Sequence, residues 1–248
     1  MDISRIYYEK WLGKDNCLID KENLQFIYSE ERNQVQLGYS ERFDLYVWIG
    51  LNRSVVSYGD ATSQKLEALK ERLSTNQNIS EITTLLTEIY ECEVKHQIKY
   101  AFEKVPEIIS NQPKTLLATD YQDYEVFFRT CQPNVTDISW LLEYFEEMIA
   151  EGLCVGIYED GKIVCCTDAP MMPYLADQTQ EIGVNTLPAY RQKGYAASAC
   201  RQVVANILEN NKVPIWSTTG NNQGSQKLAE RVGFKKLADV LTITVKEV

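Results

Sequence analysis

Histidine is nearly absent from this chain of 248 residues, which contains only His96. Metal centres built from several histidines are therefore excluded, and a Ser-His-Asp hydrolase would depend on this one position. His96 lies in a segment with strand character. We interpret it as a structural histidine rather than as a catalytic base.

The sequence also lacks any Cys-x-x-Cys pair, although it contains seven cysteines. This absence argues against zinc ribbons and thioredoxin-like redox chemistry, and no metal site is expected. The cysteine number is odd, the spacing is irregular, and a chain of this length can fold without disulfides. We expect free thiols in a reducing compartment. The cysteines are Cys17, Cys92, Cys131, Cys154, Cys165, Cys166 and Cys200.

Positive charge is scarce, with 25 Lys and Arg against 35 Asp and Glu and a net charge of −10. This balance argues against binding to nucleic acids or to anionic membranes, and it favours cationic small molecules such as amines. The first residues lack the apolar stretch of a signal peptide, and the apolar run at 45–51 is too short to span a bilayer. These features predict a cytoplasmic protein.

Hydrophobic patterning divides the N-terminal part into short elements. We expect strands at 43–49 and 54–58, helices at 62–73 and 80–91, and a strand at 94–104. Ser80 is the expected N-cap of the second helix. Pro106 and Pro113 then interrupt the pattern, and we place a domain boundary there. The first domain, 1–112, is a smaller α/β domain with no motif that we can assign.

The second predicted domain, 113–248, begins with a helix and a β-hairpin. Asp160-Gly161 is a strong turn signal between the two apolar runs of this hairpin. The expected elements are a helix at 137–150, the hairpin at 153–168, a strand at 179–186, a helix at 195–210, a strand at 213–217, a helix at 223–232 and a strand at 241–248. This order predicts a mixed α/β fold with a largely antiparallel beginning and a helical crossover.

The segment 181–196 has the features of an anion site. A strand ends before Pro188, a short basic turn follows, and a helix then begins. The first amides of a helix have no internal acceptor, and the helix dipole adds partial positive charge there. Arg191 and Lys193 add full charges, and Gly194 lets the backbone approach a ligand closely. The segment therefore predicts a cradle for a phosphate or pyrophosphate, although a purely structural turn would have the same pattern.

Two motifs at the expected separation resemble the GNAT superfamily of acyl-CoA-dependent N-acyltransferases. The loop 191–196, Arg-Gln-Lys-Gly-Tyr-Ala, resembles its motif A, in which an Arg/Gln-x-x-Gly-x-Gly/Ala loop follows a strand that ends in a proline. The segment 216–234 resembles motif B, with Asn222 at a helix start and a closing Gly-Phe. The resemblance covers 116–248 and implies a mixed, mainly antiparallel central sheet flanked by helices.

The resemblance implies a site for acetyl-CoA. The loop amides of such proteins hold the pyrophosphate, and free backbone groups of the central strand hold the pantetheine arm. Asn222 and Ser225 match positions that line the cofactor or cap a helix, and capping alone would explain Asn222. The residues implied to bind the cofactor are Val184, Asn185, Thr186, Arg191, Gln192, Lys193, Gly194, Tyr195, Ala196, Asn222 and Ser225.

The same resemblance implies direct attack of an amine on the thioester, with a base that removes a proton from the ammonium. Glu181 is the best candidate, unless the strand register turns Gln180 toward the cleft instead. The general acid departs from the family pattern, because Ala229 stands where many members have a Tyr. Tyr190 is our catalytic candidate for this role, with Tyr174 and Ser225 as alternatives.

The leading hypothesis is an N-acetyltransferase that transfers an acetyl group from acetyl-CoA to a primary amine of a small molecule in a ternary complex. The N-terminal domain would then form a wall of the acceptor site, which the loop around Met171, Met172 and Tyr174 would border. The main alternative is an inactive acyl-CoA-binding sensor or interaction protein, which the missing Tyr favours. Acyl transfer from aminoacyl-tRNA is a third possibility that the acidic charge disfavours. A homodimer through the C-terminal strand stays open.

Overall fold

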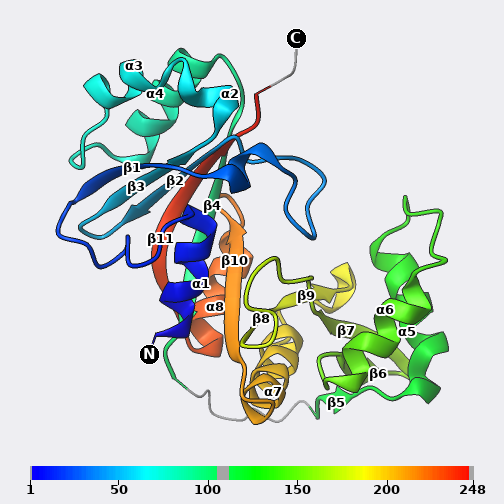
Figure 1. The fold of residues 1–248 in the computed structure, drawn as a ribbon. Helices are drawn as coiled ribbons and strands as arrows, with labels where there is room; N and C mark the ends of the chain where they lie inside the picture. Colours follow the sequence, from blue (N-terminus) through cyan, green and yellow to red (C-terminus); the bar gives the residue numbers. More distant parts are fainter. Residues whose placement is uncertain (1, 105–111, 246–248) are drawn as a thin grey trace.

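The computed structural model describes residues 2–104 and 112–245, and these residues form two β-sheets with helices packed on them (Figure 1). A seven-stranded sheet has the order β1-β3-β2-β11-β4-β10-β8, and a four-stranded sheet has the order β5-β6-β7-β9. The strands of the first sheet are β1 (Leu24–Tyr28), β2 (Leu45–Gly50), β3 (Ser54–Tyr58), β4 (Val94–Phe102), β8 (Thr179–Glu181), β10 (Val213–Thr219) and β11 (Phe234–Ile243). Those of the second are β5 (Lys114–Thr115), β6 (Val155–Glu159), β7 (Lys162–Asp168) and β9 (Gly183–Thr186).

The helices follow the hydrophobic patterning in most places. They are α1 (Ile3–Leu12), α2 (Asp60–Ser63), α3 (Leu66–Arg72), α4 (Ile79–Tyr90), α5 (Tyr121–Cys131), α6 (Leu141–Ala150), α7 (Tyr195–Glu209) and α8 (Gln223–Val232), with 3-10 turns at Glu30–Asn33, Ala118–Asp120 and Pro188–Tyr190. The mixed α/β fold with a mainly antiparallel central sheet is confirmed. The predicted hairpin is also confirmed, and its turn residues Asp160 and Gly161 have φ angles of 52° and 75°.

The seven-stranded sheet joins segments from both ends of the chain. Strand β11 lies between β2 and β4, and β4 lies between β11 and β10. Strands from both sides of the boundary placed at residue 112 therefore share hydrogen bonds in one sheet. Pro106, which helped to place that boundary, lies outside the described residues.

Each face of this sheet is covered by different helices, and the side chains of β2 are buried on both faces. Tyr46 and Trp48 of β2 pack with Trp11 of α1 on one face. Leu45 and Val47 pack with residues of α3 and α4 on the other face. The face under α1 also includes Ile215 of β10, so α1 lies on the same side as the end of β8.

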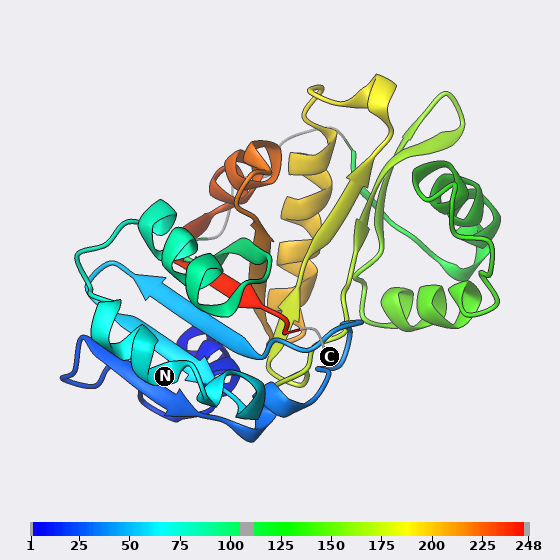
Figure 2. The same ribbon diagram turned by 90° about the horizontal axis from the view of Figure 1, so that it is seen from above.

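Helix α7 connects the two sheets. Its buried side chains, among them Cys200, Val203 and Val204, pack in one core with Trp216 of β10 and Val164 of β7. Figure 2 shows α7 running between β10 and the strands of the second sheet. This arrangement places the N-terminus of α7 at the junction of the two sheets.

The predicted strand 179–186 is wrong in one respect, because it is split between the two sheets. Strand β8 pairs in parallel with β10, whereas β9 pairs antiparallel with β7. The backbone N–H of Ile182 still donates to the carbonyl of Ile215 at 3.1 Å, and beyond it β9 separates from β10. Alternation of side chains does not specify the partner of a strand, so the sequence pattern could not show this divergence.

Several other expectations need correction. The patterning does not predict helices α1 and α5, because aromatic residues, which favour strands, supply most of their buried faces. The helix expected at 62–73 is broken into α2 and α3, and the one expected at 137–150 begins at Leu141. The last strand begins at Phe234 instead of residue 241, and residues 246–248 of the predicted strand lie outside the described residues.

The N-cap of α4 is Asn78, not Ser80 as predicted. The Asn78 side chain accepts a hydrogen bond from the Glu81 backbone at 3.0 Å, and the Glu81 carboxylate accepts one from the Asn78 backbone at 2.8 Å. This reciprocal capping box satisfies two backbone donors. The apolar residues of the helix do not show where its first turn begins, which explains the shift by two positions.

We expect Asn78→Ala to lower the free energy of unfolding by about 1 kcal/mol, because it removes the acceptor of the first-turn amide. Ser80→Ala, inside the same helix, should change it by less than about 0.5 kcal/mol. Urea denaturation of both variants measures the difference. Equal losses at the two positions would contradict the assignment of the cap.

Candidate active site

The separation of β9 from β10 opens a groove with a volume of about 800 Å³. Residues of β9 form one wall and residues of β10 form the other, and the first turns of α7 and α8 also line the groove. The predicted cofactor residues that line it are Val184, Asn185, Thr186, Arg191, Gln192, Gly194, Tyr195, Ala196, Asn222 and Ser225, together with the catalytic candidate Tyr190. Lys193 and Glu181 are not among the lining residues.

One edge of β9 faces this groove with free backbone donors. The N–H of Leu187 donates to Val164 of β7 at 2.9 Å, and Thr186 pairs with Cys165 in the same register. In an antiparallel ladder, alternate residues turn their N–H groups toward the partner strand. The N–H groups of Val184 and Thr186 therefore point away from β7, toward the groove. A ligand that lies along β9 can accept hydrogen bonds from both.

The N-terminus of α7, which lines the groove, has the features of an anion site. Gly194 is its N-cap residue with φ 85°, and no side chain caps the helix there. Gln192, two residues before Gly194, also has a left-handed backbone, with φ 65°. The helix has 15 residues, so its dipole and its uncapped first-turn amides concentrate positive charge at this point. Arg191 lies beside it and its Nε donates to the Thr186 carbonyl at 3.1 Å.

A carboxylate at the tip of the hairpin holds the loop from outside. The Tyr195 hydroxyl donates to Glu159, and Lys193 Nζ lies 3.4 Å from the same carboxylate. The hydrogen bond to Glu159 is the main reason that the pKa of Tyr195 is raised. Lys193 therefore supports the loop from the hairpin side, which explains why it does not line the groove.

Helix α8, which begins after the end of β10, also borders the groove. The Asn222 side chain accepts the Ser225 N–H at 3.1 Å, and Ser225 Oγ accepts the Trp216 indole N–H at 3.1 Å. Asn222 is thus an N-cap, and both residues still line the groove. Lys227 and Arg231 of the same helix also line it, and sequence reasoning missed both. Their spacing of four residues on one helix face was the available signal.

Glu181 lies at the end of β8, one hydrogen bond away from the groove. The hydroxyl of Ser217 donates to its carboxylate, and Ser217 itself lines the groove. Gln180 is buried, and its Nε2 donates to the carbonyl of Pro170 at 3.1 Å. Of these two neighbours, Glu181 is therefore the one that is connected to the groove.

A buried lysine next to Glu181 is a further residue that the sequence did not reveal. Lys99 of β4 is 4% exposed and stands directly opposite Ser217 in the sheet register. Its Nζ donates to Gln97 Oε1 at 2.7 Å. Burial lowers the pKa of Lys99, and the negative charge of Glu181 opposes this shift. Nothing in the sequence separates Lys99 from Lys95, which lies on the same strand and is exposed.

The candidates for the general acid differ in position. Tyr190 and Ser225 line the groove, whereas Tyr174 packs with Trp11 in the core under α1. Ala229 is fully buried in the core on which α8 packs. A larger side chain at this position would have no open space to enter.

We therefore expect Ala229→Tyr to destabilise the protein by about 3 kcal/mol, because it overpacks a filled core. Glu230→Tyr, on the exposed face of the same helix, is the matched control and should change stability by less than about 0.5 kcal/mol. Urea denaturation measures both. An unchanged stability of Ala229→Tyr would show that the side chain reaches the groove.

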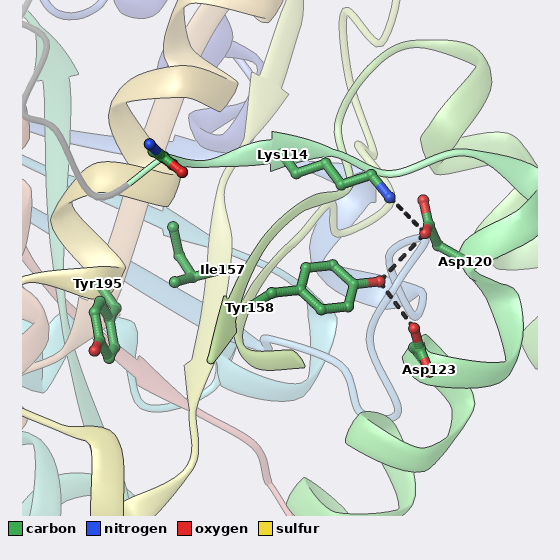
Figure 3. Close-up of a pocket in the computed structure, with 7 residues that line it drawn as sticks. Lys114, Asp120, Asp123, Ile157, Tyr158 and Tyr195 are labelled. Carbon is green, nitrogen blue, oxygen red and sulfur yellow. Dashed lines mark hydrogen bonds and ion pairs between the residues drawn. The ribbon is translucent and has the colours of Figure 1, made fainter. Parts of the chain in front are cut away.

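A second hollow of about 770 Å³ lies between β6 and the segment that leads into α5 (Figure 3). Lys114 and Tyr158 both point toward Asp120, at 2.6 Å and 3.3 Å, and Tyr158 also donates to Asp123 at 3.1 Å. These polar groups satisfy one another. Two carboxylates also make this hollow a poor site for phosphates, so the groove is the better candidate active site.

Comparison with known proteins agrees with this geometry. A family model described as GNAT acetyltransferase matches residues 41–239. The chain belongs to this family. A search of curated protein sequences gives no match.

Solved structures of GNAT proteins share the fold. A GNAT-family acetyltransferase from Colwellia psychrerythraea is 15% identical over 74% of this chain and 72% of its own, with a TM-score of 0.52. A GNAT-family protein from Novosphingobium aromaticivorans is 23% identical over 63% of this chain and 66%, just under two thirds, of its own, with a TM-score of 0.48. The protein yncA from Salmonella typhimurium, solved with its cofactor acetyl-CoA, is 14% identical over 55% of this chain and 95% of its own, with a TM-score of 0.44.

Within residues 2–104 and 112–245, no helix has the length and apolar character needed to cross a membrane. The same residues contain no group of His, Cys, Asp and Glu side chains that could hold a metal ion.

Proposed function

We propose that the protein is an N-acetyltransferase that transfers an acetyl group from acetyl-CoA to a primary amine of a small molecule. One observation carries this proposal: the groove between β9 and β10 joins an uncapped helix N-terminus at one end to Ser217, which binds the Glu181 carboxylate. Anion binding and a proton acceptor are thus available along one continuous surface.

The groove residues fit the chemical parts of acetyl-CoA. The amides of the loop 191–196 would hold the pyrophosphate at the positive end of α7. The outward N–H groups of Val184 and Thr186 would hold the amide carbonyls of the pantetheine arm. Lys227 and Arg231 would add positive charge for the remaining phosphate. These donors support the fit to an anionic ligand, although the net charge of the whole protein is −10.

The bound cosubstrate supplies an acyl group that is activated as a thioester. The chain orients this group and removes a proton. Glu181 accepts the proton of the attacking ammonium, so that the amine nitrogen forms the new bond to the carbonyl carbon and the bond to sulfur breaks. Ser217 holds the carboxylate in place through its hydrogen bond. Ser225 or Tyr190 would support the departing thiolate, since both line the groove.

The acceptor would approach from the sheet face that α1 covers. Glu181, Ile215 and Ser217 share this face, as the register of β8 with β10 shows. The aromatic side chains of the N-terminal part pack there as well. We infer that residues 1–112 supply the acceptor wall, as the sequence predicted.

The test is acetyl transfer by the purified protein to a panel of primary amines, with products identified by mass spectrometry. We expect an acetylated amine whose formation depends on acetyl-CoA. Calorimetry with acetyl-CoA is run in parallel. Tight binding without transfer to any amine would instead support the alternative of an inactive acyl-CoA-binding protein, for which the buried Ala229 is the structural argument.

A further inference from the structure

Arg32 is a completely buried charge on the face of the large sheet that α1 covers. Its guanidinium carbon lies 5.7 Å from the ring centre of Trp11 and 5.4 Å from that of Tyr46. None of its three guanidinium nitrogens has a partner at full hydrogen-bond geometry within the described residues, although the Tyr174 hydroxyl is close enough to favour the charged form. The two aromatic rings hold the cation without satisfying its donors.

An arginine cannot avoid the free-energy cost of burying its charge by losing its proton. Burial lowers the pKa of Arg32, while Tyr174, Tyr46 and Glu31 nearby oppose the shift. The group stays charged at any physiological pH, because an arginine side chain is not deprotonated in proteins. The hydroxyl of Tyr174 is already directed to Glu31 Oε2 at 2.9 Å and Gln36 Oε1 at 2.7 Å. The Tyr174 oxygen can accept at most a contact from one side of the guanidinium, so most of its five donors have no acceptor within the described residues.

Three hydroxyl groups, those of Tyr46 and two residues beside it, are also buried without a hydrogen-bond partner among the described residues. Tyr46 pairs with Ser57 of β3 on one side and with Thr242 of β11 on the other, so their side chains lie on one face of the sheet. The hydroxyls of all three are buried and have no hydrogen-bond partner in the described part of the chain. Buried polar groups without partners are rare, and several in one place indicate a missing ligand or water.

This region is connected to the candidate base. Burial is the largest cause of the raised pKa of Tyr46. The charge of Glu181 adds to this rise and the charge of Arg32 opposes it, so both charges act on Tyr46. The loop 169–178 reaches both ends. Met172 Sδ accepts the Glu181 N–H at 3.1 Å, and Tyr174 packs on Trp11 at 5.4 Å between ring centres. Opening of this one loop would give access to Glu181 and Arg32 together.

We propose that the acceptor is an amine that also carries a carboxylate, with Arg32 as the carboxylate-binding residue and Glu181 at the amine end. This inference rests on the proposed acetyl transfer. A guanidinium binds a carboxylate through two parallel hydrogen bonds, and the ligand would satisfy the donors that the protein leaves free. The rings of Trp11, Tyr39 and Tyr46 form the apolar wall for the carbon skeleton between the two charges.

The experiment compares acceptors that differ only in the carboxylate. Suitable pairs are phenylalanine with 2-phenylethylamine, lysine with cadaverine, and 4-aminobutyrate with propylamine. We expect kcat/KM for at least one carboxylate-bearing member to exceed that of its partner by about 100-fold, as is typical for a hydrogen-bonded charge pair. The N-acetyl form of the preferred acid should raise the melting temperature without any turnover.

Arg32→Met should remove this preference by lowering kcat/KM for the acid about 100-fold, with the simple amine changed less than threefold. Arg72→Met removes an exposed positive charge from the same protein and serves as the matched control. Tyr46→Phe, which keeps the ring, should lower kcat/KM for the acid and leave that for the simple amine unchanged. Free of ligand, Arg32→Met should melt at least as high as the native protein, because it removes a buried charge without a hydrogen-bond partner.

The outcomes separate this inference from the proposed function. Transfer to acids and amines at equal rates, or no effect of Arg32→Met on the preference, would overturn the carboxylate site and leave acetyl transfer standing. A ligand-free Arg32→Met that melts much lower than the native protein, with equal losses for acids and amines, would show a structural role only. Arg32-dependent binding of acids without any transfer would support the site and contradict acetyl transfer.

Discussion

Gly194→Asp is expected to abolish measurable acetyl-CoA binding, a loss of at least 100-fold in affinity. The new carboxylate would lie at the N-terminus of α7, where the pyrophosphate is proposed to bind, and would repel it. The substitution also places a side chain on a residue with φ 85°, where an L-residue is strained. Isothermal titration calorimetry with acetyl-CoA measures the effect.

Gly161→Asp is the matched control for this variant. Gly161 also has a left-handed backbone, with φ 75°, and a Cβ added there would meet nothing within 4 Å. The control therefore carries similar backbone strain and the same added charge, but at the hairpin tip. We expect native affinity for acetyl-CoA. If both variants bound acetyl-CoA as the native protein does, the loop 191–196 would not be the pyrophosphate site.

Glu181→Gln should lower kcat by about 100- to 1,000-fold while the affinity for acetyl-CoA stays within about twofold. The amide cannot accept the ammonium proton, and removal of a positioned general base typically costs this much. The hydrogen bond from Ser217 can persist, because the amide oxygen still accepts it. Steady-state kinetics with a saturating amine gives kcat, and calorimetry gives the affinity.

Glu209→Gln makes the same change at the exposed end of α7 and should leave both quantities unchanged. Ser217→Ala removes the hydrogen bond that holds Glu181, so we expect a smaller loss in kcat, about tenfold. If the Glu181→Gln variant kept full activity, Lys99 would replace Glu181 as the candidate base. Its buried amine stands opposite Ser217 and could take a proton if it were neutral.

Much of the site could be predicted from the sequence, because it depends on local chemistry. The loop 191–196 combines a strand end, a glycine and a helix start within a few residues, and such a signal needs no knowledge of distant contacts. The hairpin turn at Asp160-Gly161 is equally local. The position of Glu181 close to the groove also follows from its place in a short strand just before that loop.

Other parts could not be predicted because they depend on contacts between distant segments. Arg32 and Lys99 look like ordinary surface residues in the sequence, and only packing under α1 and within the sheet buries them. The connection of Glu181 to Ser217 joins residues that are 36 positions apart. The division of the chain at residue 112 stays a prediction, and the interleaving of β4 and β11 shows why composition alone does not decide it.

The sequence by itself determined the family motifs, the hairpin turn and the turn 191–196 that is proposed to bind an anion, because dihedral preferences, apolar periodicity and helix-end chemistry act over a few residues. The type of the central sheet followed from the family resemblance. The tertiary structure alone decided that the 179–186 segment divides between two sheets and that the groove opens where it divides. It also decided which charged side chains are buried near Glu181. The physical reason is that strand partners and burial are set by the competition of all segments for one core, which no short stretch of sequence contains.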